Sequence, residues 1–201
     1  MRALIECSRV AGAPYTVCKV FSDKPDAAGL EVARGLGVPG EALDGAQTAD
    51  RAAYDRALAA AIGACSPTLI VLAGFMRILS PPFVTDFVGR ILNIHPSLLP
   101  KFPGLNTHRR ALEAHEAQHG ATVHFVTAEL DRGPRIIQAR VGVTAQDDEA
   151  SLAARVQAQE HRIYPLAVRW FCEGRLRYGD GQAWLDGQVL REPVQFTDTE
   201  P

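Results

Sequence analysis

The sequence predicts an α/β fold in which a mostly parallel sheet is flanked by helices and followed by a small carboxyl-terminal hairpin. Three observations indicate this fold. Apolar runs of strand length alternate with segments of helix length through the first half of the chain. The run Leu69–Ala73 is apolar throughout, which is typical of a strand buried on both faces of a parallel sheet. Glycine-containing turns separate two short strand-like pieces between Arg175 and Leu190.

The first half of the chain is predicted to contain four helices and three strands. Helix ends are marked by Gly37, which stops a helix, by Asp50, which can cap one, and by Pro81, which is tolerated in a first turn. The expected helices are Arg2–Ser8, Asp26–Leu36, Asp50–Ala64 and Pro81–Val88. The expected strands are Tyr15–Phe21, Leu69–Ala73 and Arg90–Ile94.

The pattern changes after His95. The stretch Pro96–Thr107 holds three prolines and a glycine and is predicted to be a structured loop. The expected elements beyond it are the helices His108–His115 and Asp148–Phe171, the strands Ala121–Val126 and Ile136–Val143, and the hairpin Arg175–Leu190.

Length and composition indicate one domain. The chain has 201 residues, of which 47% are hydrophobic and 22% charged, so it is not of the disordered class. No repeat or linker divides it. We expect a single domain over residues 1–190 and a flexible tail over 191–201.

Charge and cysteine usage exclude several classes of partner. The chain has 21 basic and 23 acidic residues and a net charge of −2, so we expect neither a nucleic-acid nor a membrane partner. No apolar run approaches the roughly 18 residues needed to span a bilayer, and no signal peptide is evident. The four cysteines form no close pairs, which predicts reduced thiols and a cytoplasmic location.

Two strand ends carry the residues best suited to chemistry. Asn93 and His95 are two positions apart, so on a strand they face the same side. An amide can hold a developing oxyanion while an imidazole moves a proton, which is the chemistry of acyl transfer. Asp131, in a Gly-Pro loop, could orient and charge the imidazole. The alternative is structural, because a buried Asn or His at a strand end is more often a packed residue.

A zinc site is a second possibility that the sequence raises. His115 and His119 are four apart in a region predicted to be helical, which is the spacing of two ligands on one helix face. No third ligand accompanies them, so no metal is expected.

Several segments together resemble the phosphoribosylglycinamide formyltransferase family. The segment Asn93–Pro100 followed by Pro103-Gly104 is similar to its signature, and Val71–Leu79 is similar to its folate-side loop. Gly120–Val126 with Leu130–Pro134 resembles the segment that carries its catalytic aspartate. Gln157, Glu160 and Tyr164-Pro165 match its long helix, so the resemblance extends to about residue 190.

The resemblance implies a Rossmann-like formyltransferase fold and transfer of a formyl group from 10-formyltetrahydrofolate to the amine of glycinamide ribonucleotide in purine biosynthesis. Asn93 would hold the oxyanion, His95 would act as general acid, and Asp131 would pair with His95 and take the amine proton through water. The folate-binding positions would be Arg51, Met76, Arg77, Ile78, Leu79, Asn93, Thr127, Ala128, Glu129, Leu130 and Asp131. Gln157 and Glu160 would bind the nucleotide, with His108 and His124 as supporting residues.

The beginning of the chain departs from the family pattern. The family starts with an apolar strand and a Gly-x-Gly-Ser-Asn loop that cradles phosphate at a helix N-terminus. Met1–Glu6 instead resembles the body of the first helix, so the first strand and the phosphate loop are expected to be missing. Either translation starts upstream or the chain is a truncated form. The loss predicts neighbouring strands without ladder partners and a weakly held nucleotide.

Two alternatives to the transferase are kept. A formyltetrahydrofolate hydrolase shares the Asn, His and Asp residues and uses water as the acceptor. A non-catalytic truncated paralogue would bind folate or a partner without turnover, and this reading is motivated by the missing loop. The sequence gives no indication of the oligomeric state.

Overall fold

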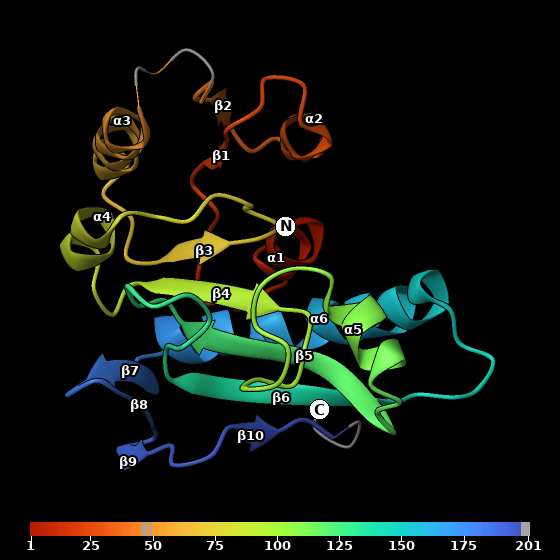
Figure 1. The fold of residues 1–201 in the computed structure, drawn as a ribbon. Helices are drawn as coiled ribbons and strands as arrows, with labels where there is room; N and C mark the ends of the chain where they lie inside the picture. Colours follow the sequence, from red (N-terminus) through yellow and green to blue (C-terminus); the bar gives the residue numbers. More distant parts are fainter. Residues whose placement is uncertain (46–47, 49, 198–201) are drawn as a thin grey trace.

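The computed structural model describes residues 1–45, 48 and 50–197. Its centre is a five-stranded sheet with the order β10-β6-β5-β4-β3. The strands are β3 (Ile70–Leu72), β4 (Ile91–His95), β5 (Gln118–Phe125), β6 (Arg135–Gly142) and β10 (Val194–Gln195). Helices flank this sheet, so the predicted α/β class is confirmed (Figure 1).

The sheet is mixed in direction. β3 is parallel to β4, and β10 is parallel to β6, but β5 is antiparallel to both of its neighbours. The long pairing of β5 with β6 explains why two apolar runs of strand length follow one another without a helix between them. Parallel pairing therefore lies at the two edges of the sheet, and the middle is antiparallel.

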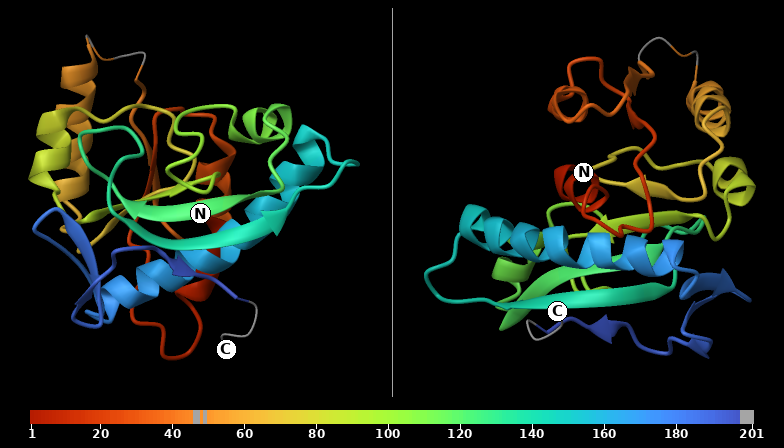
Figure 2. Two further views of the ribbon diagram at one scale, coloured as in Figure 1. Left: turned by 60° about the horizontal axis from the view of Figure 1, so that its bottom comes forward. Right: turned by 180° about the vertical axis from the view of Figure 1, so that it is seen from behind.

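Helix α6 (Glu149–Cys172) covers one face of this sheet. It runs across β4, β5 and β6 in Figure 2, and its buried side chains belong to the main core cluster with those of β5 and β6. Its start is fixed by a capping box, in which the side chains of Asp148 and Ser151 each bond the other residue's backbone N–H. The helix continues through Pro165 to Cys172 without a break.

The helices α3 (Arg51–Gly63) and α4 (Pro81–Asp86) form a second core cluster with the start of β4. The Asp50 carboxylate accepts a bond from the Ala53 N–H at 2.7 Å and caps α3, as its position before the helix predicts. A shorter helix, α5 (Thr107–Glu113), follows the predicted proline-rich loop.

The amino-terminal part holds a separate two-stranded sheet. Helix α1 (Arg2–Cys7) precedes β1 (Val20–Ser22), and α2 (Ala28–Gly35) connects β1 to the parallel strand β2 (Gly40–Ala42). The predicted strand Tyr15–Phe21 is wrong over residues 15–19, which join no ladder in the described part of the chain, and β2 was not predicted.

A cavity of about 670 Å³ lies between these two sheets. It is lined on one side by residues 14–23 and on the other by residues 67–75, so it separates β1 from β3. Within the described residues no strand occupies this gap.

The carboxyl-terminal part forms a three-stranded antiparallel sheet where a hairpin was predicted. Its strands are β7 (Leu176–Gly179), β8 (Gln182–Leu185) and β9 (Gln188–Val189). Residues 191–201 were expected to be a flexible tail, yet β10 lies within them and the Phe196 N–H donates to Gln138 O. Residues 198–201 of that expected tail lie outside the described part.

All four cysteines are free thiols. Across the part of the chain that the structure describes, no helix combines the length and the apolar character that crossing a bilayer requires.

Candidate active site

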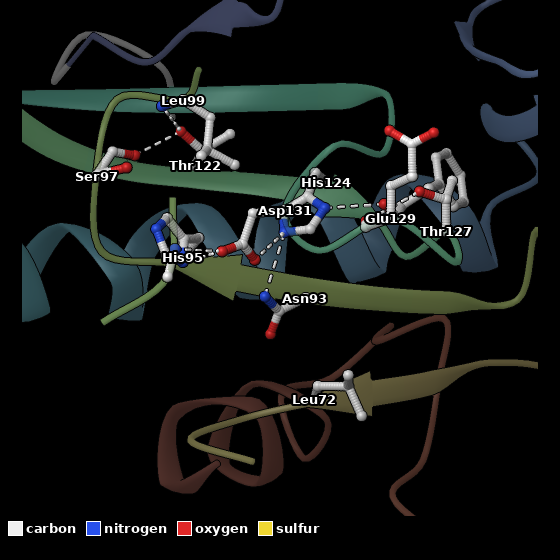
Figure 3. Close-up of polar contacts among 12 residues, drawn as sticks. Leu72, Asn93, His95, Ser97, Leu99, Thr122, His124, Thr127, Glu129 and Asp131 are labelled. Atoms are coloured by element: carbon white, nitrogen blue, oxygen red, sulfur yellow. Dashed lines mark hydrogen bonds and ion pairs between the residues drawn. The ribbon is translucent and has the colours of Figure 1, made fainter. Parts of the chain in front are cut away.

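Strand β4 presents the two residues that the strand-end argument selected. Asn93 and His95 lie two positions apart on β4, opposite His124 and Thr122 of β5. The antiparallel pairing therefore adds His124 to the same cluster as Asn93 (Figure 3).

Asp131 reaches this cluster from the loop between β5 and β6. Its backbone has φ 53°, in the left-handed region. Gly133 allows the loop to fold back, since a Cβ there would lie 1.8 Å from Phe125 O. The Asp131 side chain is 7% exposed, and its Oδ2 accepts a bond from the Gly104 N–H at 2.8 Å.

His95 faces oxygen acceptors at both ring nitrogens. Its Nε2 lies 2.9 Å from the carbonyl oxygen of Phe102, and its Nδ1 lies 3.5 Å from Asp131 Oδ2. A carbonyl and a carboxylate oxygen can only accept, so a proton on either ring nitrogen has an acceptor facing it. The arrangement therefore orients the His95 ring between Phe102 and a buried carboxylate.

His124 is held as a neutral ring. Burial lowers the pKa of its ring, and its Nδ1 donates to Phe125 O at 2.8 Å. Its Nε2 therefore keeps a lone pair, which accepts a bond from the Asn93 amide nitrogen at 3.2 Å. The 3.8 Å contact between His124 Nε2 and Asp131 Oδ1 is then not an ion pair.

This pairing fixes the orientation of the Asn93 amide. One N–H points at His124, and the second N–H remains available for another acceptor. A neutral, buried histidine thus presents an amide donor beside the His95–Asp131 pair, which is the arrangement an oxyanion requires.

A buried polar network supports the loop that contributes Phe102 and Gly104. The Thr122 hydroxyl donates to Ser97 O at 2.6 Å and accepts from the Leu99 N–H at 3.1 Å. The Gln138 amide donates to Leu99 O at 2.7 Å. Neither these residues nor the backbone groups of Phe102 and Gly104 were predicted, because a main-chain donor or acceptor has no residue-type signature.

The predicted folate loop after β3 divides into exposed and anchored side chains. Met76 and Ile78 are 73% and 54% exposed, while Leu79 is buried. Arg51 donates to the Leu79 carbonyl at 2.8 Å and so braces the end of this loop. The structure therefore brings Arg51 to the backbone of the predicted loop.

Arg77 turns away from solvent onto an aromatic ring. Its guanidinium stacks on Tyr54, 4.3 Å from the ring centroid, and lies 3.9 Å from an Asp23 carboxylate oxygen. Tyr54 is almost fully buried, and its hydroxyl has no partner among the described residues. Tyr54 was not predicted as a site residue, since 23 positions separate it from Arg77.

The other predicted folate segment, Thr127–Asp131, forms the turn that leads into Asp131. The Thr127 hydroxyl donates to Glu129 O at 3.3 Å, Ala128 and Glu129 are exposed, and Leu130 is 52% exposed. Leu130, Met76 and Ile78 are three of the six exposed large hydrophobic side chains in the described chain.

The predicted nucleotide residues lie apart from this cluster. Gln157 and Glu160 are on α6, and among the described residues neither contacts Asn93, His95 or Asp131. Burial raises the pKa of the Glu160 carboxyl, and the amino terminus of Met1 opposes part of this rise.

His108, predicted as a supporting residue, pairs with His119 instead of the catalytic cluster. Its Nδ1 lies 3.1 Å from His119 Nε2, and the two rings are edge to face. Burial, followed by the charge of His108, lowers the pKa of His119 to about 4. The expectation that His115 and His119 lie on one helix face is wrong, because His115 lies in a turn and His119 lies on β5.

Comparisons with known proteins agree with this geometry. Residues 1–168 match the family model described as "Formyl transferase". The chain is 54% identical over 190 residues to phosphoribosylglycinamide formyltransferase of Escherichia coli, covering 94% of this chain and 90% of that protein. It is 42% identical over 190 residues to the enzyme of the same name from Haemophilus influenzae, with the same coverage.

Solved structures give the same result. The phosphoribosylglycinamide formyltransferase of Coxiella burnetii, solved in complex with CHES, superposes with a TM-score of 0.93 at 44% identity, covering 98% of this chain and 92% of that one. Glycinamide ribonucleotide transformylase 1 of Symbiobacterium toebii gives a TM-score of 0.88 at 47% identity, covering 92% and 87%. The chain therefore belongs to the phosphoribosylglycinamide formyltransferase family.

Proposed function

We propose that this protein transfers a formyl group from 10-formyltetrahydrofolate to the amine of glycinamide ribonucleotide, with Asn93, His95 and Asp131 as its catalytic residues. The observation that carries the proposal is the buried cluster in which an oriented amide N–H lies beside a histidine–carboxylate pair. The family relationship supports the substrates, and the comparisons give no support to the hydrolase alternative.

In this proposal Asn93 binds the oxygen of the formyl group. As the amine attacks the formyl carbon, that oxygen gains negative charge, and the free N–H of Asn93 stabilises it. His124 keeps the amide turned in this direction because its Nε2 can only accept. No reorientation of the donor is then needed during the reaction.

His95 and Asp131 share the proton transfers. Asp131, held by the Gly104 N–H, takes the proton of the attacking amine through water, and His95 gives a proton to the departing folate nitrogen. His95 Nε2 lies 2.9 Å from Phe102 O, so an N–H at this nitrogen must exchange the carbonyl for the substrate atom. Catalytic hydrogen bonds often form only when substrate binds.

The surface around the cluster suits a flat, partly apolar co-substrate. The exposed side chains of Met76, Ile78 and Leu130 offer apolar contacts to a ring system, and the backbone groups of Thr127–Asp131 can pair with its polar edge. Arg77 in the predicted folate loop and Arg51 at the start of α3, which donates to the Leu79 carbonyl, are the nearby cations. Gln157 and Glu160 on α6 are proposed for the nucleotide.

The test is a formyl-transfer assay with both substrates. His95→Ala and Asp131→Asn should each lower kcat by about 10²–10⁴-fold, since each removes a proton-transfer group. The matched controls are His161→Ala and Asp86→Asn, which change exposed residues outside the cluster and should leave kcat within about twofold. Near-normal turnover in either site variant would overturn the assignment.

The same assay separates the alternatives. Formate release in the absence of glycinamide ribonucleotide, at the rate of formyl transfer in its presence, would identify a hydrolase. Binding of the folate without either product would identify a non-catalytic binding module. We expect transfer to the amine to exceed hydrolysis.

A further inference from the structure

A second pocket lies behind the loop that carries Asp131. It has a volume of about 600 Å³ and separates residues 127–129 and 132–135 from the carboxyl-terminal residues 181–183, 189–191 and 193. Asn93, His95 and Asp131 do not line it, so it is distinct from the catalytic cluster. Thr127–Glu129 on its wall belong to the segment proposed for the folate edge, whereas its arginines have no part in the proposed reaction.

The charged groups of this pocket are mostly cationic. Arg132, Arg135 and Arg191 line it, and Glu129 is its one carboxylate among the described lining residues. The guanidinium groups of Arg132 and Arg191 make no hydrogen bond or ion pair with any residue that the structure describes. Two exposed arginines with unused donors therefore line one pocket.

Arg135 is the anchored member of this group. It donates to Leu99 O at 3.0 Å and lies 3.6 Å from Glu192, whose side chain is 81% exposed. So exposed an ion pair contributes little and is easily replaced. A guanidinium has five N–H donors, so Arg135 can keep its bond to Leu99 and still bind a ligand.

We propose that this pocket is a binding site for a phosphoryl group, such as pyrophosphate or the diphosphate of a nucleotide. Planar guanidinium groups bind phosphate oxygens in pairs. Arg135 is paired with Glu192, so Arg132 and Arg191 against Glu129 leave the pocket with an excess of positive charge. A phosphoryl group offers these two guanidinium groups more acceptor oxygens than a monocarboxylate does. The volume is ample for a diphosphate and is within the range of small-molecule sites.

A ligand in this pocket would restrain the loop between β5 and β6 that carries Asp131. Arg132 directly follows Asp131, and Arg135 holds Leu99 in the segment that supplies Phe102 O to His95 and the Gly104 N–H to Asp131. Arg191 lies on the opposite wall. Binding would therefore join the two ends of the loop to the carboxyl-terminal strands. This inference does not depend on the proposed reaction.

The test is calorimetric titration with sodium pyrophosphate at constant ionic strength, with acetate as the control titrant. The pocket variant is Arg132→Ala/Arg191→Ala, and the matched control is Arg34→Ala/Arg56→Ala, which removes two exposed arginines elsewhere. The pocket variant should bind pyrophosphate at least tenfold more weakly, and the control within twofold of the parent. No binding by the parent, or equal losses in both variants, would overturn the proposal.

Two further arms locate the ligand and identify its source. Amide NMR shifts on adding pyrophosphate should concentrate in residues 127–135 and 181–193, and shifts confined to residues 76–79 and 93–95 would overturn the site. Adenosine diphosphate binding at least tenfold more tightly than pyrophosphate would assign the pocket to a nucleotide, and equal affinity would assign it to the inorganic anion. The single variant Arg191→Glu repeats the test if the double variant does not fold.

Discussion

The amide of Asn93 is held in place by one side chain, that of His124. We predict that His124→Ala lowers kcat for formyl transfer by about 10–100-fold, because the Asn93 N–H loses its acceptor and the amide can rotate. KM should change much less, since His124 is buried and away from the exposed binding surface. Steady-state kinetics with both substrates measures this difference.

His124→Gln is the informative companion to that variant. Its amide oxygen can accept the Asn93 N–H as His124 Nε2 does, so kcat should recover in part. A purely structural role would instead make both variants unstable with unchanged kcat per folded molecule. That outcome would contradict the positioning role of His124.

The lowered pKa of His119 predicts how the free energy of unfolding depends on pH. Its pKa is about 4 in the folded protein, below the ordinary value of 6.5. Between these pH values the unfolded chain therefore binds a proton at His119 that the folded protein does not bind. The contribution of His119 to the free energy of unfolding is fully present above about pH 6.5 and is lost as pH falls towards 4. The loss is up to about 3 kcal/mol, because the residue is only 1% exposed. The pKa of His108 is lowered as well, which adds a loss of the same sign.

The measurement is urea unfolding at pH 7 and pH 4.5, for the parent and for His119→Asn. The variant cannot titrate at this position, so its free energy of unfolding should fall less between the two pH values. Other groups titrate in both proteins and cancel in the comparison. Parallel pH profiles for the two proteins would contradict the assignment.

At the scale of elements, Tyr164 ties α6 to the two strands that lead into the site. Its hydroxyl lies 2.7 Å from Leu72 O on β3 and 2.9 Å from Leu92 O on β4, and the residue is buried. Tyr164→Phe should lower the free energy of unfolding by about 1–2 kcal/mol, because the one hydroxyl proton that the Leu72 and Leu92 carbonyls share is lost. Urea unfolding measures this loss.

Tyr178→Phe is the matched control for Tyr164→Phe. The hydroxyl of Tyr178 has no hydrogen-bond partner among the described residues, and its ring packs on Phe125 in both forms. Its removal should change stability by less than about 0.5 kcal/mol. Equal losses in the two variants would show that the bond from α6 contributes nothing.

Element prediction succeeded where the side-chain pattern is strong. The apolar run of β3, the capped helices α3 and α6, and the proline-rich loop were all predictable from residue type. Strand β2 has the sequence Gly-Glu-Ala, which carries no β-branched or aromatic residue, so only its pairing with β1 reveals it. The two-residue strand β10 is likewise defined by its partner alone.

The candidate site divides in the same way. Asn93, His95 and Asp131 could be selected because their side chains suit one kind of chemistry. The carbonyl of Phe102 and the N–H of Gly104 could not, since every residue has these groups and only folding brings them to His95 and Asp131. The Arg77–Tyr54 stack forms where the loop after β3 meets helix α3. The spacing of the two residues in the sequence does not indicate this contact.

At the scale of the whole molecule, two regions differ in how much of their backbone is hydrogen-bonded and how many of their side chains are buried. Strand β5 pairs with both β4 and β6, and seven of its eight residues are buried. Across the cavity, residues 15–19 donate no backbone hydrogen bond to any described residue, and β3 is paired along one edge alone. Opening of the amino-terminal region should therefore require less free energy than unfolding of the central sheet.

Hydrogen exchange tests this difference directly. The amides of Thr16–Lys19 should exchange at nearly unprotected rates, while those of Thr122 and Val123 in β5 should exchange at least about 1,000-fold more slowly, through global unfolding. Within β3, the parallel register turns the Val71 N–H towards the cavity and the Leu72 N–H towards β4, so Val71 should exchange faster than its neighbour. Equal protection of Thr16–Lys19 and Val123 would show that the two regions unfold as one unit.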